Sequence, residues 1–207
     1  NYKATAYLLI FLIFSTTLSA QDVVIKNDNG NPVTSGYQSR PDWEESALLI
    51  PDGPCKVKEL QVYLAGDNAA TDEIRIMGDP SEGAIAPTLW VENYNTLVSP
   101  IQIEYGNPGW RNIKIDGLRL GGFDRVWVIH DLNADGPWFA IDDNGLTTKP
   151  YRGYIMDPHN NNSLGFPGVY YLAGGDFMVR LVVEYTYPKD GTSQGPPPPS
   201  FVDVTEE

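Results

Sequence analysis

The chain has 207 residues and a formal net charge of −13, from 14 Lys and Arg against 27 Asp and Glu. Such an acidic surface repels phosphate backbones and anionic lipid, which excludes nucleic acids and membrane surfaces as expected partners. The single cysteine, Cys55, excludes an internal disulfide framework, so a packed core must stabilise the fold. The chain is long enough for such a core, because a domain of about 150 residues buries roughly two-thirds of its unfolded surface.

Residues 1–20 predict a secretory signal peptide. Lys3 supplies the positive charge, Ala6–Phe14 the apolar region, and Ser15–Ala20 the small residues before a cut expected after Ala20. The apolar region is shorter than the roughly 18 residues that span a bilayer, which disfavours a membrane anchor. Cleavage removes only Lys3 from the charge count and takes the net charge from −13 to −14. We therefore expect a secreted, extracellular or cell-surface protein with no membrane insertion after cleavage.

From residue 21 to residue 187 the chain shows short apolar or alternating runs bounded by Gly, Pro, Asn and Asp, and no helical periodicity. About ten strands at this spacing predict an all-β domain, an antiparallel two-sheet β-sandwich. Their unequal lengths and the lack of an internal repeat favour jelly-roll topology. The expected strands are Asp22–Lys26, Ala47–Ile50, Lys58–Leu64, Glu73–Met77, Thr88–Val91, Ile101–Tyr105, Arg111–Ile115, Arg152–Met156, Val169–Leu172 and Asp176–Tyr187, with a hairpin between the seventh and eighth of these.

That hairpin is predicted from the apolar runs Val126–Ile129 and Pro137–Ile141 and the acidic turn Asp131–Gly136 between them. Apolar runs that flank a short turn ending in Asp-Gly are a strong hairpin signal. Both faces of the first run are apolar, which indicates a central strand buried on both sides.

After Tyr187 the composition changes. Pro188–Ser200 has four consecutive prolines and no apolar periodicity, which predicts an extended, semi-rigid linker. The remaining residues, Phe201–Glu207, begin Phe-x-Asp-Val-Thr, and this motif resembles the opening of FG-GAP/VCBS repeats, which build extracellular β-propellers. The region before the linker resembles the β-sandwich modules near the N-termini of large secreted bacterial proteins. The resemblance implies that residues 201–207 start a truncated downstream domain of the same chain.

A calcium site is one hypothesis for the central turn. Asp131, Asn133 and Asp135 alternate and Gly136 follows, which matches the first half of an EF-hand loop. Asp142 occupies the twelfth position, where a longer Glu is usual. The alternative is that these residues only form a turn, where Asn, Asp and Gly are favoured for their backbone freedom.

Catalysis has little support. The two histidines, His130 and His159, lack the spacing of zinc ligands, and His130 on a strand face is better explained as a hydrogen-bonded structural residue. The adjacent carboxylates of Glu44 and Glu45 face opposite ways on a strand, so they cannot act as a pair. We therefore do not expect an enzyme, although a glycan-active hydrolase remains a third alternative.

Aromatic residues suggest ligand binding. Trp110 follows a Gly-Asn-Pro-Gly turn and Tyr151 follows a proline, so both lie beside loops where a ligand can reach them. Together with Trp138 they are the candidate ligand-binding residues. The alternative is that aromatic residues simply fill the core, as expected for Trp127. The sequence predicts a non-catalytic extracellular module that recognises a glycan or a protein; a structural spacer or adhesin segment with no small ligand is the alternative.

Overall fold

A computed structural model describes residues 22–33, 43–66, 71–78, 96–104, 106–121, 124–132, 137–143, 153–161, 167–172 and 175–186. Within these ranges the secondary structure is entirely β, and every strand pairing is antiparallel. The all-β, antiparallel sandwich predicted from the sequence is confirmed. The predicted strand Thr88–Val91, the signal peptide, the linker and the residues after it lie outside the described residues.

The strands fall into two large sheets and one small pair. They are β1 (Asp22–Lys26), β2 (Pro32–Val33), β3 (Glu44–Leu49), β4 (Cys55–Ala65), β5 (Thr71–Gly78), β6 (Thr96–Glu104), β7 (Gly109–Lys114), β8 (Arg119–Leu120), β9 (Val126–Asp131), β10 (Trp138–Phe139), β11 (Ile141–Asp142), β12 (Gly153–Asn161), β13 (Pro167–Leu172) and β14 (Val179–Tyr185).

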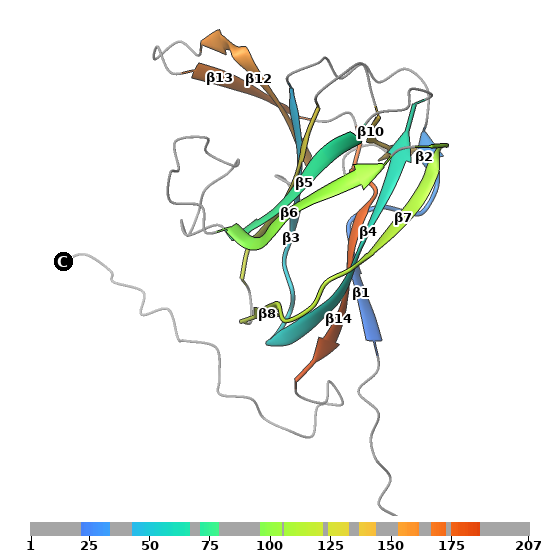
Figure 1. Ribbon diagram of the computed structural model, residues 1–207, viewed down its shortest axis with the longest axis vertical. Coiled ribbons are helices and arrows are strands. Elements are labelled where there is room, and N and C mark those ends of the chain that lie inside the picture. The colour runs from blue at the N-terminus through green and yellow to red at the C-terminus, as the bar shows by residue number, and fades with distance from the viewer. Residues whose placement is uncertain are drawn as a thin grey trace, which may run out of the picture.

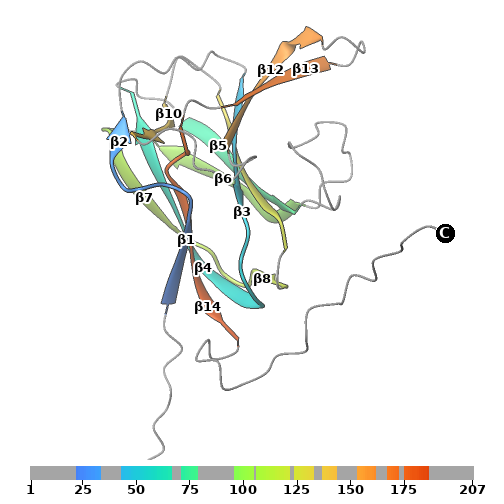
Figure 2. The same cartoon turned by 180° about the vertical axis from the view of Figure 1, so that it is seen from behind.

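The first sheet is organised around β4, its longest strand. Leu60 of β4 pairs with Leu181 of β14 and also with Ile113 of β7, so these two strands lie on opposite edges of β4 and the order is β1-β14-β4-β7. The short strands β10 and β8 pair with the two ends of β4. The second sheet has the order β13-β12-β3-β9-β5-β6. In Figures 1 and 2 the two sheets face each other, and β12 and β13 extend beyond the rest of their sheet.

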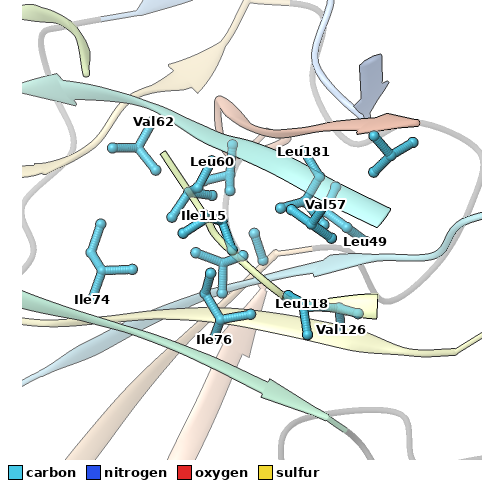
Figure 3. Close-up of a cluster of buried hydrophobic side chains, with 14 of the residues drawn as sticks. Leu49, Val57, Leu60, Val62, Ile74, Ile76, Ile115, Leu118, Val126 and Leu181 are labelled. Atoms are coloured by element: carbon cyan, nitrogen blue, oxygen red, sulfur yellow. The ribbon is translucent and has the colours of Figure 1, made fainter. Parts of the chain in front are cut away.

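The core lies between the two sheets and is made by residues that alternate along the strands. Leu60, Val62 and Leu64 face inward from β4, as the alternation predicts, and are fully buried. Val57 also faces inward although it is three residues from Leu60, because the β14 pairing shifts by one residue there and forms a bulge. Figure 3 shows Val57, Leu60 and Val62 facing Ile74 and Ile76 of the second sheet.

The hairpin predicted from Val126–Ile129 and Pro137–Ile141 is wrong. β9 pairs along one edge with β3 and along the other with β5, so it has no free edge for the segment that follows. β10 instead pairs with the end of β4 in the first sheet, so the chain crosses from one sheet to the other after β9. The prediction that β9 is a central strand buried on both faces is confirmed, since residues 126–130 are all buried.

Candidate functional site

Three large aromatic side chains gather on the outer face of the first sheet: Tyr63, Trp110 and Trp138, called here the aromatic platform. Tyr63 of β4 and Trp110 of β7 are directly opposite in the register, which places both side chains on the same face. Trp138 of β10 is opposite Ala65, two residues further along β4 and therefore on the same face again. Each of the three residues is half-buried.

The platform rests on a floor of smaller residues, Ala65, Ala140 and Met178, which are completely buried. Tyr63 and Trp110 pack edge to face with ring centroids 5.4 Å apart, a favourable geometry for an aromatic pair. The ring of Trp138 lies over Gly66, where a Cβ atom would come within 2.8 Å of it. The absence of a side chain at Gly66 therefore lets this ring lie close to the sheet.

A fixed arginine supports one edge of the platform. The guanidinium carbon of Arg180 on β14 lies 4.1 Å from the ring centroid of Trp110, within cation–π range. Two nitrogens of Arg180 donate to the two carboxylate oxygens of Asp28, at 2.9 and 2.5 Å. Because the Asp28 carboxylate is fully buried, this two-pronged ion pair fixes the guanidinium plane and thereby the ring stacked on it.

Two of the three aromatic residues singled out from the sequence, Trp110 and Trp138, are thus brought together, and Tyr151 lies outside the described residues. Tyr63 and Arg180 are the residues that the sequence reasoning missed. Tyr63 could have been identified from the sequence, because it is an aromatic residue on the polar side of the alternating run Lys58–Leu64. Arg180 could not, because its two partners, Asp28 and Trp110, are distant in the sequence.

A second charged group lies on the outer face of the second sheet. Glu44 of β3 is directly opposite Asp131 of β9, and Arg75 of β5 donates to both carboxylates, at 2.6 and 2.5 Å. Like charges directly opposite each other destabilise a sheet, so the cation between them is needed. Burial, together with the negative charge of Asp131, raises the pKa of Glu44 to about 7, although Arg75 opposes this shift.

On the inner face the same two strands carry a buried polar pair, Glu45 and His130. Nδ1 of His130 lies 3.2 Å from Oε2 of Glu45, and the backbone N–H of Phe139 donates to the same oxygen at 2.6 Å. The carboxylate therefore joins β3 of the second sheet to β10 of the first. His130 is hydrogen-bonded, as predicted, and Glu44 and Glu45 face opposite ways, as predicted.

The calcium hypothesis stays a prediction. Asn133 and Asp135 lie outside the described residues, while Asp131 binds Arg75. Asp142 accepts hydrogen bonds from the backbone N–H groups of Asn29 and Asp176, at 3.0 and 3.2 Å. Burial raises the pKa of Asp142, as do its acidic neighbours. Among the described residues no group of three or more His, Cys, Asp or Glu side chains is placed to hold a metal ion.

The thiol of Cys55 is buried. Burial and the nearby Asp124 raise its pKa to about 11, so the thiol is protonated at neutral pH. Because the thiolate is the nucleophilic form, burial makes this thiol a poor nucleophile.

Comparison of the chain with protein-family models, with curated proteins and with solved structures gave no match. Within the described ranges there is also no helix long and apolar enough to cross a membrane.

Proposed function

We propose that this protein is a non-catalytic extracellular recognition module whose aromatic platform binds a glycan. The observation that carries the proposal is the placement of Tyr63, Trp110 and Trp138 side by side on an outer sheet face, where each keeps part of its surface in solvent. Aromatic residues that only fill a core, such as Trp127, are completely buried. The platform differs from them in this respect.

The chemistry of the platform suits a neutral sugar. Pyranose rings have apolar C–H faces that stack on flat aromatic surfaces, and rigid aromatic side chains lose little entropy on binding. Gln61 of β4 and Asn112 of β7 are directly opposite each other, two residues along from Tyr63 and Trp110 and on the same face. Their amides can exchange hydrogen bonds with sugar hydroxyls, as ligand sites with a few polar groups do. The net charge of −13 disfavours polyanionic ligands.

The preorganised geometry also favours binding over a purely structural use. The Asp28–Arg180 ion pair holds Trp110 in place before any ligand arrives, which lowers the entropic cost of binding.

The strand order also supports a jelly roll, as part of the proposal. The sheets β1-β14-β4-β7 and β3-β9-β5-β6 contain eight strands in the alternating order that two interlocked Greek keys produce, with β12 and β13 added at one edge. Lectin domains are among the proteins that use this architecture. The apolar segment Ala6–Phe14 followed by small residues supports secretion.

The test is a glycan-array screen of the full chain, followed by calorimetric titration with the best neutral oligosaccharide. Trp110→Ala and Trp138→Ala should each weaken binding by about tenfold or more, as expected for aromatic anchors. The matched control is Asn27→Ala, which removes a polar side chain outside the platform and should leave the affinity within about threefold of the parent.

A flat signal across all sugars would overturn the proposal and leave a structural spacer or adhesin segment as the remaining function. Equal losses in Asn27→Ala and in the tryptophan variants would also contradict it, because such a result indicates general damage to the fold. Circular dichroism and melting curves of each variant distinguish damage to the fold from loss of contacts.

A further inference from the structure

A small cavity opens at the end of the sandwich that lies away from the aromatic platform. Its volume is about 120 Å³, and its walls come from β5, β6, β8, the segment before β9 and β9 itself. The lining residues are Gly78, Leu97, Arg119, Leu120, Asp124, Arg125 and Val126. β8 pairs with the Cys55 end of β4, whereas Trp138 pairs with the Ala65 end, and Figure 1 shows β8 and β10 near opposite ends of β4. Eleven strand residues separate the two sites by about 30 Å.

Among the described residues that line the cavity, basic side chains outnumber acidic ones. Arg119 and Arg125 contribute two guanidinium groups against one carboxylate, that of Asp124. The Asp124 carboxylate is engaged within its own loop, where it accepts a hydrogen bond of 2.6 Å from the backbone N–H of Gly121. Arg119 is exposed and forms no ion pair with another described residue. Its donors are therefore available to a ligand.

The local charge, not the net charge, decides which ligand the cavity attracts. At physiological ionic strength the screening length is about 8 Å, so most of the acidic surface contributes little inside the cavity. Leu97, Leu120 and Val126 form the apolar part of the wall beside the two guanidinium groups. Arginine also presents paired donors that match the oxygens of a carboxylate or sulfate group.

The volume sets the size of the ligand. Cavities for drug-sized ligands are larger, about 300–1,000 Å³. The cavity therefore fits a small oxyanion or the acidic group of a larger molecule, but not an oligosaccharide.

We propose that this cavity binds a small oxyanion, a carboxylate or sulfate group, between Arg119 and Arg125. The group can be a free inorganic or organic anion, or the acidic substituent of a sugar. This site is separate from the aromatic platform, so its existence does not depend on glycan binding there.

The test is calorimetric titration of the full chain with sulfate, glucuronate and glucose, at an ionic strength kept constant with sodium chloride. Sulfate or glucuronate should bind saturably, and glucose should not. Arg119→Gln and Arg125→Gln should each weaken binding by about tenfold or more, as expected for the loss of a charged hydrogen-bond donor. Lys114→Gln makes the same charge change on an exposed residue of β7 and should leave binding unchanged.

Leu97→Trp fills the cavity without changing any charge and should also abolish binding. If Arg125→Gln fails to fold, the Arg119→Gln variant still tests the proposal, because Arg119 is exposed and its replacement should not affect folding. Binding of sulfate alone supports a free inorganic anion, and binding of glucuronate alone supports an acidic sugar. The proposal is overturned if neither anion binds saturably, if glucose binds as well as glucuronate, or if Lys114→Gln weakens binding as much as Arg119→Gln.

Discussion

The outer faces of the two sheets carry the same residue types, but these residues have different roles on each face. Each face carries a strand tryptophan and an arginine bound to carboxylate. On the second sheet Trp127 is completely buried with Leu48, Met77 and Ile129, whereas on the first sheet Trp110 is half-exposed. Exposure, and not residue type, separates a tryptophan that stabilises the sheet from one that can contact a ligand.

The two arginines differ in the same way. Arg75 lies between two carboxylates that face each other across neighbouring strands, so its charge offsets their repulsion. Arg180 meets a single carboxylate, and its flat face covers the ring of Trp110. We infer that the positive charge of Arg75 mainly stabilises the fold. The flat guanidinium group of Arg180 mainly holds the ring of Trp110 in the platform.

The largest effect is expected for Arg75→Leu. The change leaves the carboxylates of Glu44 and Asp131 facing each other without a cation, which should cost about 3–5 kcal/mol of unfolding free energy. Chemical denaturation measures this loss. Protonation of Glu44 relieves the repulsion, so the loss should be greater at pH 8 than at pH 5. An equal loss at both pH values would show that the charge of Glu44 has no part in it.

The next effect is a pH dependence that comes from Glu44. Its pKa is about 7 in the folded protein against an ordinary value of 4.5, so the folded state holds the proton more tightly. The contribution of Glu44 to the free energy of unfolding is therefore fully present below pH 4.5 and is lost as the pH rises through 7. This contribution is at most about 3 kcal/mol. Glu44→Gln should remove this part of the slope when denaturation is measured from pH 4 to pH 8. Glu184→Gln, at a more exposed carboxylate, serves as the control.

A matched pair of conservative changes tests the two arginines directly. Arg180→Lys keeps the charge but loses the paired donors and the flat surface, which should cost about 2 kcal/mol of stability and weaken glycan binding. Arg75→Lys keeps the charge that matters at its site and should leave glycan binding unchanged. Denaturation and titration of both variants check this. Equal affinities in the two variants would contradict the role given to Arg180.

Much of the fold is predictable from local patterns. The alternation around Leu60 and the doubly apolar run of β9 identify the central strands of both sheets, because burial on a given face follows from the two-residue period. The Asp-Gly sequence after β9 predicts a turn. It does not show which strand the next segment pairs with, since that depends on whether the edges of β9 are already occupied.

The candidate site is less predictable because its contacts are distant in the sequence. Trp110 and Trp138 are recognisable as aromatic residues beside turns, but their proximity depends on where β7 and β10 pair with β4. The contact of Asp28 with Arg180 spans 152 residues, and no local pattern encodes it. Sequence periodicity predicts which side chains share one face of a strand. The order of the strands in the sheet decides which of these side chains lie together at the site.

The smallest expected effect separates backbone strain from the support of the platform. Gly66 has a φ of +103°, and a Cβ atom there would lie 2.8 Å from the ring of Trp138. Gly117 has a φ of +82° and open space around the same position. Replacing either glycine with alanine imposes a left-handed backbone on a residue with a side chain, which costs about 1–2 kcal/mol.

Only Gly66→Ala must also displace the ring of Trp138, because the neighbouring Cβ atom cannot overlap it. We expect Gly66→Ala to lose about 1 kcal/mol more stability than Gly117→Ala, and to be the only one of the two that weakens glycan binding. Denaturation curves and titrations of the two variants measure both differences. If the variants bind the glycan equally well, the position of Trp138 above Gly66 does not matter for recognition, and the platform reduces to Tyr63 and Trp110.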